Sequence, residues 1–264
     1  MAREASAASV ARIVCTANNR IMRRKPMRRT ASEAAKRRRI GTDCALMSPQ
    51  QKEPIAKEMK PPVLSDRPNR IFGGTFMEYS QQIVLKNGKT AILRNGVEAD
   101  GSAVLENFNL THAETDYLLS YPDEINFDSE KEGQFLKQKA ESANEIEIIA
   151  FVDGKVAGTA GLDAVGTKYK VRHRAEFGIS VGKEYWGLGI GRALLEACIK
   201  CAKEAGYAQL ELSVVAENVR ALALYQKAGF VEYGRNPRGF HSRISGFQEV
   251  ISMLLALQDD NFRL

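Results

Sequence analysis

Three closely spaced glycines are the residues of this sequence best placed to bind an anion. Residues 176–191 read EFGISVGKEYWGLGIG and end in Gly187, Gly189 and Gly191, and the helical pattern RALLEACIKCAKEAG follows directly. The apolar run predicts a β-strand before the loop, and an α-helix begins inside it. Glycines allow a ligand close to the backbone, and free N–H groups at a helix N-terminus attract negative charge. We therefore predict a loop that binds an anion, in particular a pyrophosphate.

Two common phosphate-binding motifs do not fit this loop. A P-loop requires G-x-x-x-x-G-K-[ST], but Glu184 follows Gly182-Lys183, and Phe177 occupies the place of the first glycine. A dinucleotide fingerprint requires G-x-G-x-x-G, whereas position 192 is arginine. The glycines alternate instead, so a different family of phosphate sites is indicated.

Strands and helices alternate from Met77 onward and would carry this loop. Strands are predicted at 83–86, 89–93, 145–152, 155–162, 175–181, 209–215, 230–233 and 249–257, and helices at 98–112, 128–143, 190–205 and 218–227. The Asn87-Gly88 turn favours a hairpin of the primed type, and the strands between 145 and 181 suit an antiparallel meander. Strands on both sides of crossover helices favour a mixed sheet with helices packed on it.

Two connecting segments carry charge of opposite sign. The acidic stretch SYPDEINFDSE, between the first two helices, is either a solvated connection or a lid that selects cationic substrates. The segment RNPRGFHSRISGF, 235–247, is expected to link the last two strands. Its Arg235, Arg238 and Arg243 would recognise an acidic group on a ligand, unless they are simply solvated.

Cys198 and Cys201 form a C-x-x-C pair, but their positions favour packing over redox or metal chemistry. They share one apolar helix stripe with Ile190, Leu194 and Ala202, and no second cysteine pair or histidine is near. We therefore expect no metal site. With no stretch near the roughly 20 apolar residues of a membrane span, we expect no membrane association and a cytoplasmic protein with reduced thiols.

Residues 1–76 differ in composition from the rest of the chain. They hold 17 Lys+Arg and 6 Asp+Glu, whereas residues 77–264 hold 21 and 26. Such a basic segment without apolar periodicity is expected to be disordered. It would bind nucleic acid, serve as a transit or nuclear signal, or lie upstream of a true start at Met77, since Gly73-Gly74 can be encoded by a ribosome-binding sequence.

Two motifs resemble the GCN5-related N-acetyltransferases. The run VGKEYWGLGIGRALL, 181–195, is similar to their acyl-CoA-binding core Q/R-x-x-G-x-G/A, with Trp186 where Gln or Arg is usual. The run NVRALALYQKAGF, 218–230, is similar to their N-x-x-A-x-x-x-Y-x-x-x-G-F block. The resemblance covers about 145–257 and extends loosely to Met77. It implies an α/β (α+β) fold with a mixed, mostly antiparallel, splayed sheet and helices on both faces.

The resemblance further implies acetyl-CoA as donor and a primary amine as acceptor, joined by direct attack through a tetrahedral intermediate. Tyr225 would protonate the leaving thiolate. Glu176 would be the base, with His173 as an alternative. The cofactor contacts would come from Ile179, Val181, Trp186, Gly187, Leu188, Gly189, Ile190, Gly191, Arg192 and Asn218.

Several points stay open at this stage. Acetyltransferases that act on ribosomal-protein N-termini resemble the chain around Asn218 but carry a catalytic Glu at the position of Ser213, which argues against a simple transfer of their substrate. An acyl-CoA-binding module without turnover and a nucleic-acid-associated protein acting through its basic tail are the alternatives. A homodimer is also open.

Overall fold

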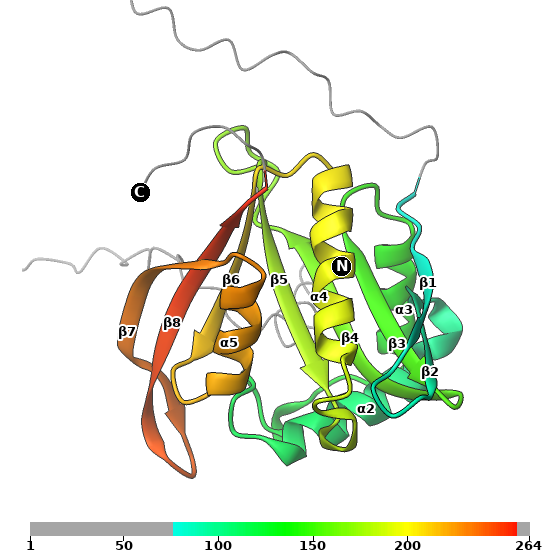
Figure 1. Ribbon diagram of the computed structural model, residues 1–264, viewed down its shortest axis with the longest axis horizontal. Coiled ribbons are helices and arrows are strands. Elements are labelled where there is room, and N and C mark those ends of the chain that lie inside the picture. The colour runs from blue at the N-terminus through cyan, green and yellow to red at the C-terminus, as the bar shows by residue number, and fades with distance from the viewer. Residues whose placement is uncertain (1–75, 258–264) are drawn as a thin grey trace, which may run out of the picture. The chain divides into compact units, whose positions relative to one another are not determined.

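The computed structural model describes residues 76–257 (Figure 1). The predictions made for the basic segment, including its disorder, its ligands and a start at Met77, lie outside the described residues apart from residue 76. The domain division at 76/77 therefore stays a prediction.

One eight-stranded sheet organises the described chain, in the order β1-β2-β3-β4-β5-β6-β8-β7. All neighbouring strands are antiparallel except β5 and β6, which are parallel, so the mixed and mostly antiparallel sheet is confirmed. The strands are β1 (Ser80–Val84), β2 (Thr90–Asn95), β3 (Ile146–Val152), β4 (Lys155–Ala164), β5 (Arg174–Val181), β6 (Gln209–Val215), β7 (Val231–Ser242) and β8 (Gly246–Ala256).

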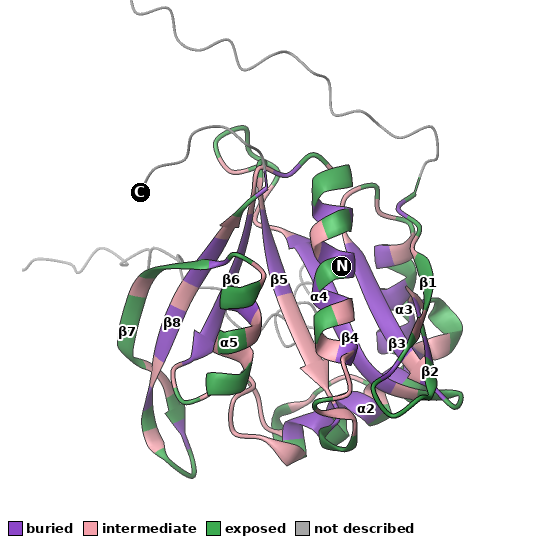
Figure 2. Cartoon of the chain, viewed as in Figure 1, coloured by how far each residue is buried: buried purple, intermediate pink, exposed green. Residues whose placement is uncertain are grey.

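Helices cover both faces of this sheet, as predicted. The α-helices are α2 (Gly101–Glu114), α3 (Ser129–Ala140), α4 (Ile190–Glu204) and α5 (Val219–Lys227), with 3₁₀ turns η1 (Glu98–Asp100), η2 (Pro122–Glu124) and η3 (Lys183–Tyr185). Because side chains alternate along a strand, Ile148 of β3 packs in the core with Leu194 of α4, whereas Ile149 packs with Val104 of α2 and Leu136 of α3. Figure 2 shows β3 and β4, which lie between these layers, as mostly buried. We call the two sides the α4 face and the α2 face.

The sheet opens between its two parallel strands. β5 and β6 are paired only at Arg174–Gln209, Ala175–Leu210 and Glu176–Glu211. From Phe177 to Val181, β5 pairs with β4 alone. Figure 1 shows β5 and β6 diverging, with α4 and α5 in front of the two arms. This is the splay that the family resemblance implied, and its narrow end lies at Glu176 and Glu211.

The two cysteines of α4 lie in the core, as their place in the apolar stripe predicted. Cys198 and Cys201 are fully buried free thiols. Burial raises the pKa of the Cys201 thiol to about 12 and raises that of Cys198 as well, because a thiolate would lose its hydration there. Both thiols are therefore packing groups.

The Asn87-Gly88 hairpin forms, but its predicted turn type is wrong. A primed turn of type I′ requires positive φ at both central residues. Only Gly88 has it, at 83°, and the Leu85 N–H donates to Lys89 O at 2.8 Å to close a wider loop. The positive pair occurs instead at Asp153 and Gly154, with φ of 49° and 77°. A two-residue connection between β3 and β4 demands that geometry.

The predicted link at 235–247 is also wrong, because most of it is strand. β7 runs to Ser242 and pairs with β8 with irregularities at Glu232–Gly234 and Asn236–Phe240. Pro237 falls in the second irregularity, and β7 lies at the edge of the sheet, where a missing backbone donor is tolerated. The proline and glycines of this segment indicated a loop, but the irregularities in the pairing allow them to lie within a β-strand.

Candidate active site

The glycine-rich loop connects the open end of β5 to α4 through two residues with left-handed backbone. Gly187 and Gly189 have φ of 80° and 107°, and a Cβ at either position would meet no atom within 4 Å. Neighbouring atoms therefore do not demand glycine here, but the backbone conformation does. The conformation starts α4 directly at Ile190, with Gly189 as its N-cap.

This loop presents backbone N–H groups without acceptors. Ala193 donates to Gly189 O, but the N–H groups of Ile190, Gly191 and Arg192 have no acceptor among the described residues. They lie in the first turn of a 15-residue helix, where the dipole also favours an anion. The described groups suit a diphosphate held by backbone donors.

Trp186, the departure from the family motif, has a structural partner. Its indole Nε1–H donates to Val181 O at 2.7 Å, and the Arg220 guanidinium lies 4.7 Å from the ring centroid. The ring thereby ties the loop to the end of β5 and to α5. A Gln or Arg side chain here would lack the flat apolar ring and single N–H donor of the indole.

The open edge of β5 turns alternate backbone groups into the splay. Gly182 N–H donates to Ala157 O, and Val165 N–H donates to Arg174 O, so the even-numbered residues of β5 face β4. The backbone groups of Phe177, Ile179 and Val181 therefore face the opening. The Phe177 N–H lies at the last β5–β6 register pair, Glu176–Glu211, and the indole of Trp186 occupies the Val181 carbonyl, which leaves the Ile179 N–H as a donor in the opening.

Glu176 lies at the narrow end of the splay, on the α2 face, since Ala175 and Phe177 are buried on the α4 face. It is 8% exposed, and its side chain forms no hydrogen bond or ion pair with the other residues of 76–257. Burial, with the nearby carboxylates of Glu211 and Asp163, raises the pKa of Glu176 to about 8, against the lowering effect of Arg174. A carboxyl group with that pKa exchanges a proton near neutral pH.

Two ion pairs flank Glu176 that the sequence did not reveal. Asp163 of β4 and Glu211 of β6 are its direct cross-strand neighbours. Asp163 accepts a hydrogen bond from the Lys139 Nζ of α3, and Glu211 accepts two from the Arg174 guanidinium, with Nη2 2.6 Å from Oε2. A single acidic residue in each of the three strands, as in QLELSVV, was the available signal.

Tyr225 of α5 reaches the same point of β5 from the α4 face. Its ring meets Phe177 edge-on, with centroids 6.2 Å apart and planes at 84°, and contacts Phe230 at 5.9 Å. The side chain is 7% exposed. Tyr225 thus closes the narrow end of the splay opposite Glu176.

The remaining predicted residues are placed as follows. Asn218 caps α5, its Oδ1 accepting from Ala221 N–H at 3.2 Å. Arg192 is exposed on α4 and pairs with Glu196 at 2.7 Å. His173 is exposed just before β5. Ser213 is buried on β6, two residues beyond Glu211 and on the same face.

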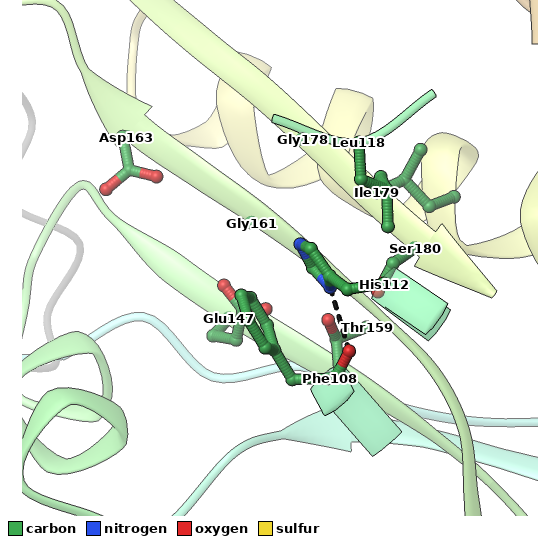
Figure 3. Close-up of a pocket in the computed structure, with 10 residues that line it drawn as sticks. All are labelled: Phe108, His112, Leu118, Glu147, Thr159, Gly161, Asp163, Gly178, Ile179 and Ser180. Atoms are coloured by element: carbon green, nitrogen blue, oxygen red, sulfur yellow. Dashed lines mark hydrogen bonds between the residues drawn. The ribbon is translucent and has the colours of Figure 1, made fainter. Parts of the chain in front are cut away.

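A small cavity lies on the α2 face beside β5 (Figure 3). It has a volume of about 20 Å³, room for one water molecule, and its lining includes Glu147, Asp163 and His112. The His112 ring stacks on Phe108, with centroids 3.7 Å apart. A Cβ at Gly161 would come 2.6 Å from the Glu147 Oε2, so a larger residue there would require that carboxylate to shift.

A larger groove of about 430 Å³ opens at the wide end of the splay. It lies between the segment 114–117, the turn with Lys183 and Trp186, and the β7–β8 hairpin. Its charged lining residues are Glu114, Asp116 and Glu217 against Lys183. The groove is therefore net acidic.

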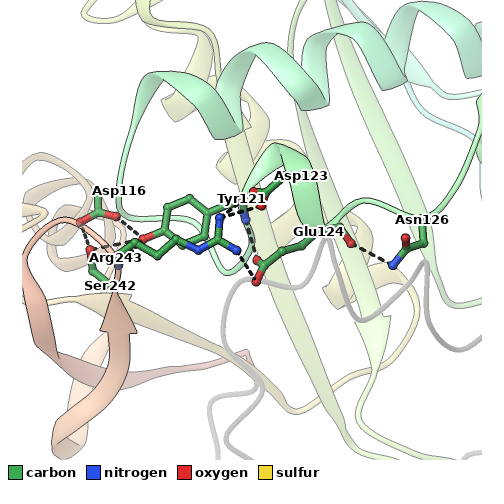
Figure 4. Close-up of polar contacts among 7 residues, drawn as sticks. All are labelled: Asp116, Tyr121, Asp123, Glu124, Asn126, Ser242 and Arg243. Carbon is green, nitrogen blue, oxygen red and sulfur yellow. Dashed lines mark hydrogen bonds and ion pairs between the residues drawn. The ribbon is translucent and has the colours of Figure 1, made fainter.

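The hairpin and the acidic connection bind each other (Figure 4). Arg243 pairs with Asp123 at 2.7 Å and with Glu124 at 3.3 Å. Asp116 accepts from the hydroxyls of Ser242 at 2.6 Å and Tyr121 at 2.9 Å, and these donors lower its pKa.

The other two arginines of this hairpin also have partners inside the protein. Arg235 pairs with Glu232 and Glu249, and Arg238 lies 4.0 Å from the Phe247 centroid. The positive charges expected to meet an acidic ligand are thus largely balanced by the protein itself.

Comparison with known proteins agrees with this geometry. The Acetyltransferase (GNAT) family matches residues 110–230. A GNAT-family acetyltransferase from Streptococcus pneumoniae is 34% identical, with a TM-score of 0.60 over 64% of this chain and 99% of that one. A putative acetyltransferase from Salmonella typhimurium, yncA, solved with its cofactor acetyl-CoA, shares the fold at 19% identity, with a TM-score of 0.57 over 65% and 96%.

Curated relatives match over a shorter stretch. The [ribosomal protein bS18]-alanine N-acetyltransferase of Escherichia coli K12 is 38% identical over 81 residues, 31% of this chain and 54% of that protein. The chain spans about half the length of this relative.

A splayed mixed sheet with an amide-lined glycine loop defines an acyl-CoA-dependent transferase fold. The chain belongs to the GNAT acetyltransferase family, an acyltransferase family whose co-substrate is acetyl-CoA. Among the helices of residues 76–257, none has the length and apolar character needed to cross a membrane.

Proposed function

We propose that this protein transfers an acetyl group from acetyl-CoA to a primary amine by direct attack, without a covalent enzyme intermediate. One observation carries the proposal: Glu176 and Tyr225 approach the same point of β5 from opposite faces, at the place where β5 separates from β6. Direct transfer needs a proton acceptor on the amine side and a proton donor on the thiolate side, and these two residues supply them.

The described residues fit acetyl-CoA. The N–H groups of Ile190, Gly191 and Arg192 would hold the diphosphate, and the open edge of β5 at Ile179 and Val181 would pair with the pantetheine arm. When bound, acetyl-CoA supplies the thioester carbonyl that accepts the amine. The Ile179 N–H faces this opening and would stabilise negative charge on the carbonyl oxygen.

Glu176 would take the proton from the incoming ammonium group. A base works best when its pKa lies near the working pH, and the pKa of Glu176 is about 8 because the carboxyl is buried beside two other carboxylates. Glu176 lacks a partner among the described residues, so its oxygens are available to an acceptor on the α2 face.

Tyr225 would donate its phenolic proton to the leaving thiolate. The Tyr225 ring packs against Phe177 and so lies on the α4 face of β5, where α4 and the glycine-rich loop also lie. The carbon–sulfur bond breaks as the new amide forms. The nitrogen loses two protons: Glu176 takes the first before the attack and later releases it to solvent. The second leaves as the tetrahedral intermediate collapses and replaces the proton that Tyr225 gives to sulfur.

The acceptor is proposed only as a class, a primary amine reaching Glu176 from the α2 face. Relatives act on the alanine of ribosomal protein bS18 or are named for L-amino acids. The resemblance implies a catalytic Glu in the ribosomal-protein enzymes at the position of Ser213, so their substrate is not proposed for this chain. A cytoplasmic location, a homodimer and nucleic-acid binding by the basic tail stay predictions.

Turnover of an amine panel tests the proposal. We would measure thiol release from acetyl-CoA with peptide N-termini, lysine, polyamines, aminoglycosides and amino acids, and acetyl-CoA binding by calorimetry. The expected result is turnover of at least one amine, reduced about 10²-fold or more in Glu176→Gln with acetyl-CoA binding retained. Binding without turnover of any amine would favour the binding module, and absent binding would overturn the assignment.

A further inference from the structure

Three carboxylates lie side by side across β4, β5 and β6 on the α2 face. Asp163, Glu176 and Glu211 occupy directly opposed register positions, and each is less than 9% exposed. Adjacent strands are about 4.8 Å apart, so three negative charges in this row would repel one another strongly. The sheet accommodates them only if charge is neutralised.

The two outer carboxylates are paired with cations, whereas the middle one is kept neutral by a proton. Asp163 pairs with Lys139, which also lies 3.6 Å from Glu145 and donates to Leu162 O at 3.3 Å. Glu211 pairs with the Arg174 guanidinium and accepts from Gln209 Nε2 at 2.9 Å. Glu176, between them, has no such partner among the described residues.

Arg174 is placed to act on both Glu211 and Glu176. It lies two residues before Glu176 on β5, so both side chains project to the same face of the sheet. Its guanidinium reaches across to β6 and donates to Glu211 through two nitrogens. Glu211 belongs to the last register pair of β5 and β6 before the two strands separate. The pair therefore lies beside the base and at the narrow end of the site.

We propose that the Arg174–Glu211 ion pair is a positioning element that controls the protonation of Glu176 and thereby the pH at which the transferase works. Glu211 supplies a negative charge that keeps a proton on Glu176, and Arg174 limits that effect. Neither residue needs to contact a substrate. This inference rests on the proposed function, in which Glu176 is the base.

Other charges near Glu176 are fixed by different elements. Asp163 with Lys139 lies on the β4 side, Glu147 and His112 line the small cavity nearby, and Tyr233 of β7 is within electrostatic reach of Glu176 and Glu211. The Lys139–Asp163 pair is more buried and joins α3 to the sheet, so its removal would disturb folding. Arg174–Glu211 is the pair that can be altered.

The test is the pH profile of kcat/KM in the full chain, with whichever amine is turned over. The acid limb reports the protonation of the base. We expect Arg174→Gln to move that limb up by about one pH unit, Glu211→Gln to move it down by about one, and the double variant to return toward the wild-type position. Arg174→Lys, which keeps the charge, should leave the limb near its original place.

Arg94→Gln provides a matched control. Arg94 forms a two-nitrogen pair with Asp100, and the side-chain exposures of 36% and 12% resemble the 34% and 10% of Arg174 and Glu211. That pair is on β2 and η1, so its loss should not move the limb.

The inference would be overturned if Arg174→Gln and Glu211→Gln lost activity equally at every pH and left the acid limb unmoved. The ion pair would then have only a structural role, as a clasp between β5 and β6. If Arg174→Gln fails to fold, Glu211→Gln alone decides, because the clasp role predicts no downward shift. Glu176→Gln separates this outcome from failure of the proposed function: an acid limb that persists in that variant would show that another group is the base.

Discussion

The two faces of the splay use different parts of the chain. On the α4 face, the N–H groups of Ile190 to Arg192 and the edge of β5 supply the donors, and the surrounding side chains are mostly apolar. On the α2 face, carboxylates from four strands lie at or near the same level of the sheet, paired with cations from α3 and β5.

The two faces should therefore differ in which substitutions they tolerate. Backbone donors are fixed by local conformation, so many side chains in the loop can change without loss of binding. Side-chain charges depend on every neighbour, so the behaviour of Glu176 depends on residues far apart in the sequence.

The largest effect is expected at Tyr225, because it is the side chain on the α4 face with a proposed role in the reaction. Tyr225→Phe removes only a hydroxyl, yet kcat should fall about 10²-fold with the KM for acetyl-CoA unchanged, because proton donation to sulfur is lost. Steady-state kinetics measure both constants. Tyr207→Phe is the control, another buried tyrosine whose hydroxyl bonds to Asn144 at 2.8 Å. Equal kcat losses in the two variants would make Tyr225 a packing residue.

A smaller effect is expected in the stability of the α2 face. The pKa of Glu176 is raised from 4.5 to about 8 on folding, so between these values the folded protein holds a proton that the unfolded chain releases. Stability contributed by this group is therefore lost as pH rises toward 8, because the charge must then be buried. Glu176→Gln should be close to wild type near pH 5 and exceed it by roughly 4 kcal/mol at pH 9.

Denaturant unfolding at the two pH values measures this difference. Glu217→Gln, at an exposed position, is the control and should change neither value. A Glu176→Gln variant with no gain at pH 9 would show that the carboxyl is better hydrated than its burial indicates.

The smallest effect is expected in the glycine loop. Gly189→Ala places a Cβ at φ 107° and should cost about 1 kcal/mol of backbone strain, seen as a KM for acetyl-CoA raised about fivefold with kcat nearly unchanged. Gly154→Ala is the control, since Gly154 has φ 77° and equally open surroundings but lies in the β3–β4 turn. A similar KM rise in both variants would remove the special role of the loop.

Much of the α4 face could be predicted from the sequence, because its signals are local. The glycine spacing, the Asn218 cap, the helix stripe with Cys198 and the strand before the loop each depend on residues within a few positions of one another. The motif resemblance then implied the splay, which the pairing of β5 and β6 confirms. Two predictions were wrong. Pro237 indicated a loop, but strand pairing continues around it, and Asn87-Gly88 indicated a primed turn, but the loop there is longer.

The row of carboxylates could not be predicted, for a physical reason. Asp163, Glu176 and Glu211 are each separated by more than ten residues in sequence, and only the register of β4, β5 and β6 makes them neighbours. Local patterns along the chain specify a buried-type strand, then an anion loop, then a capped helix. The tertiary structure decided which charges face each other across the sheet, because Coulomb interactions depend on distances that strand pairing alone sets.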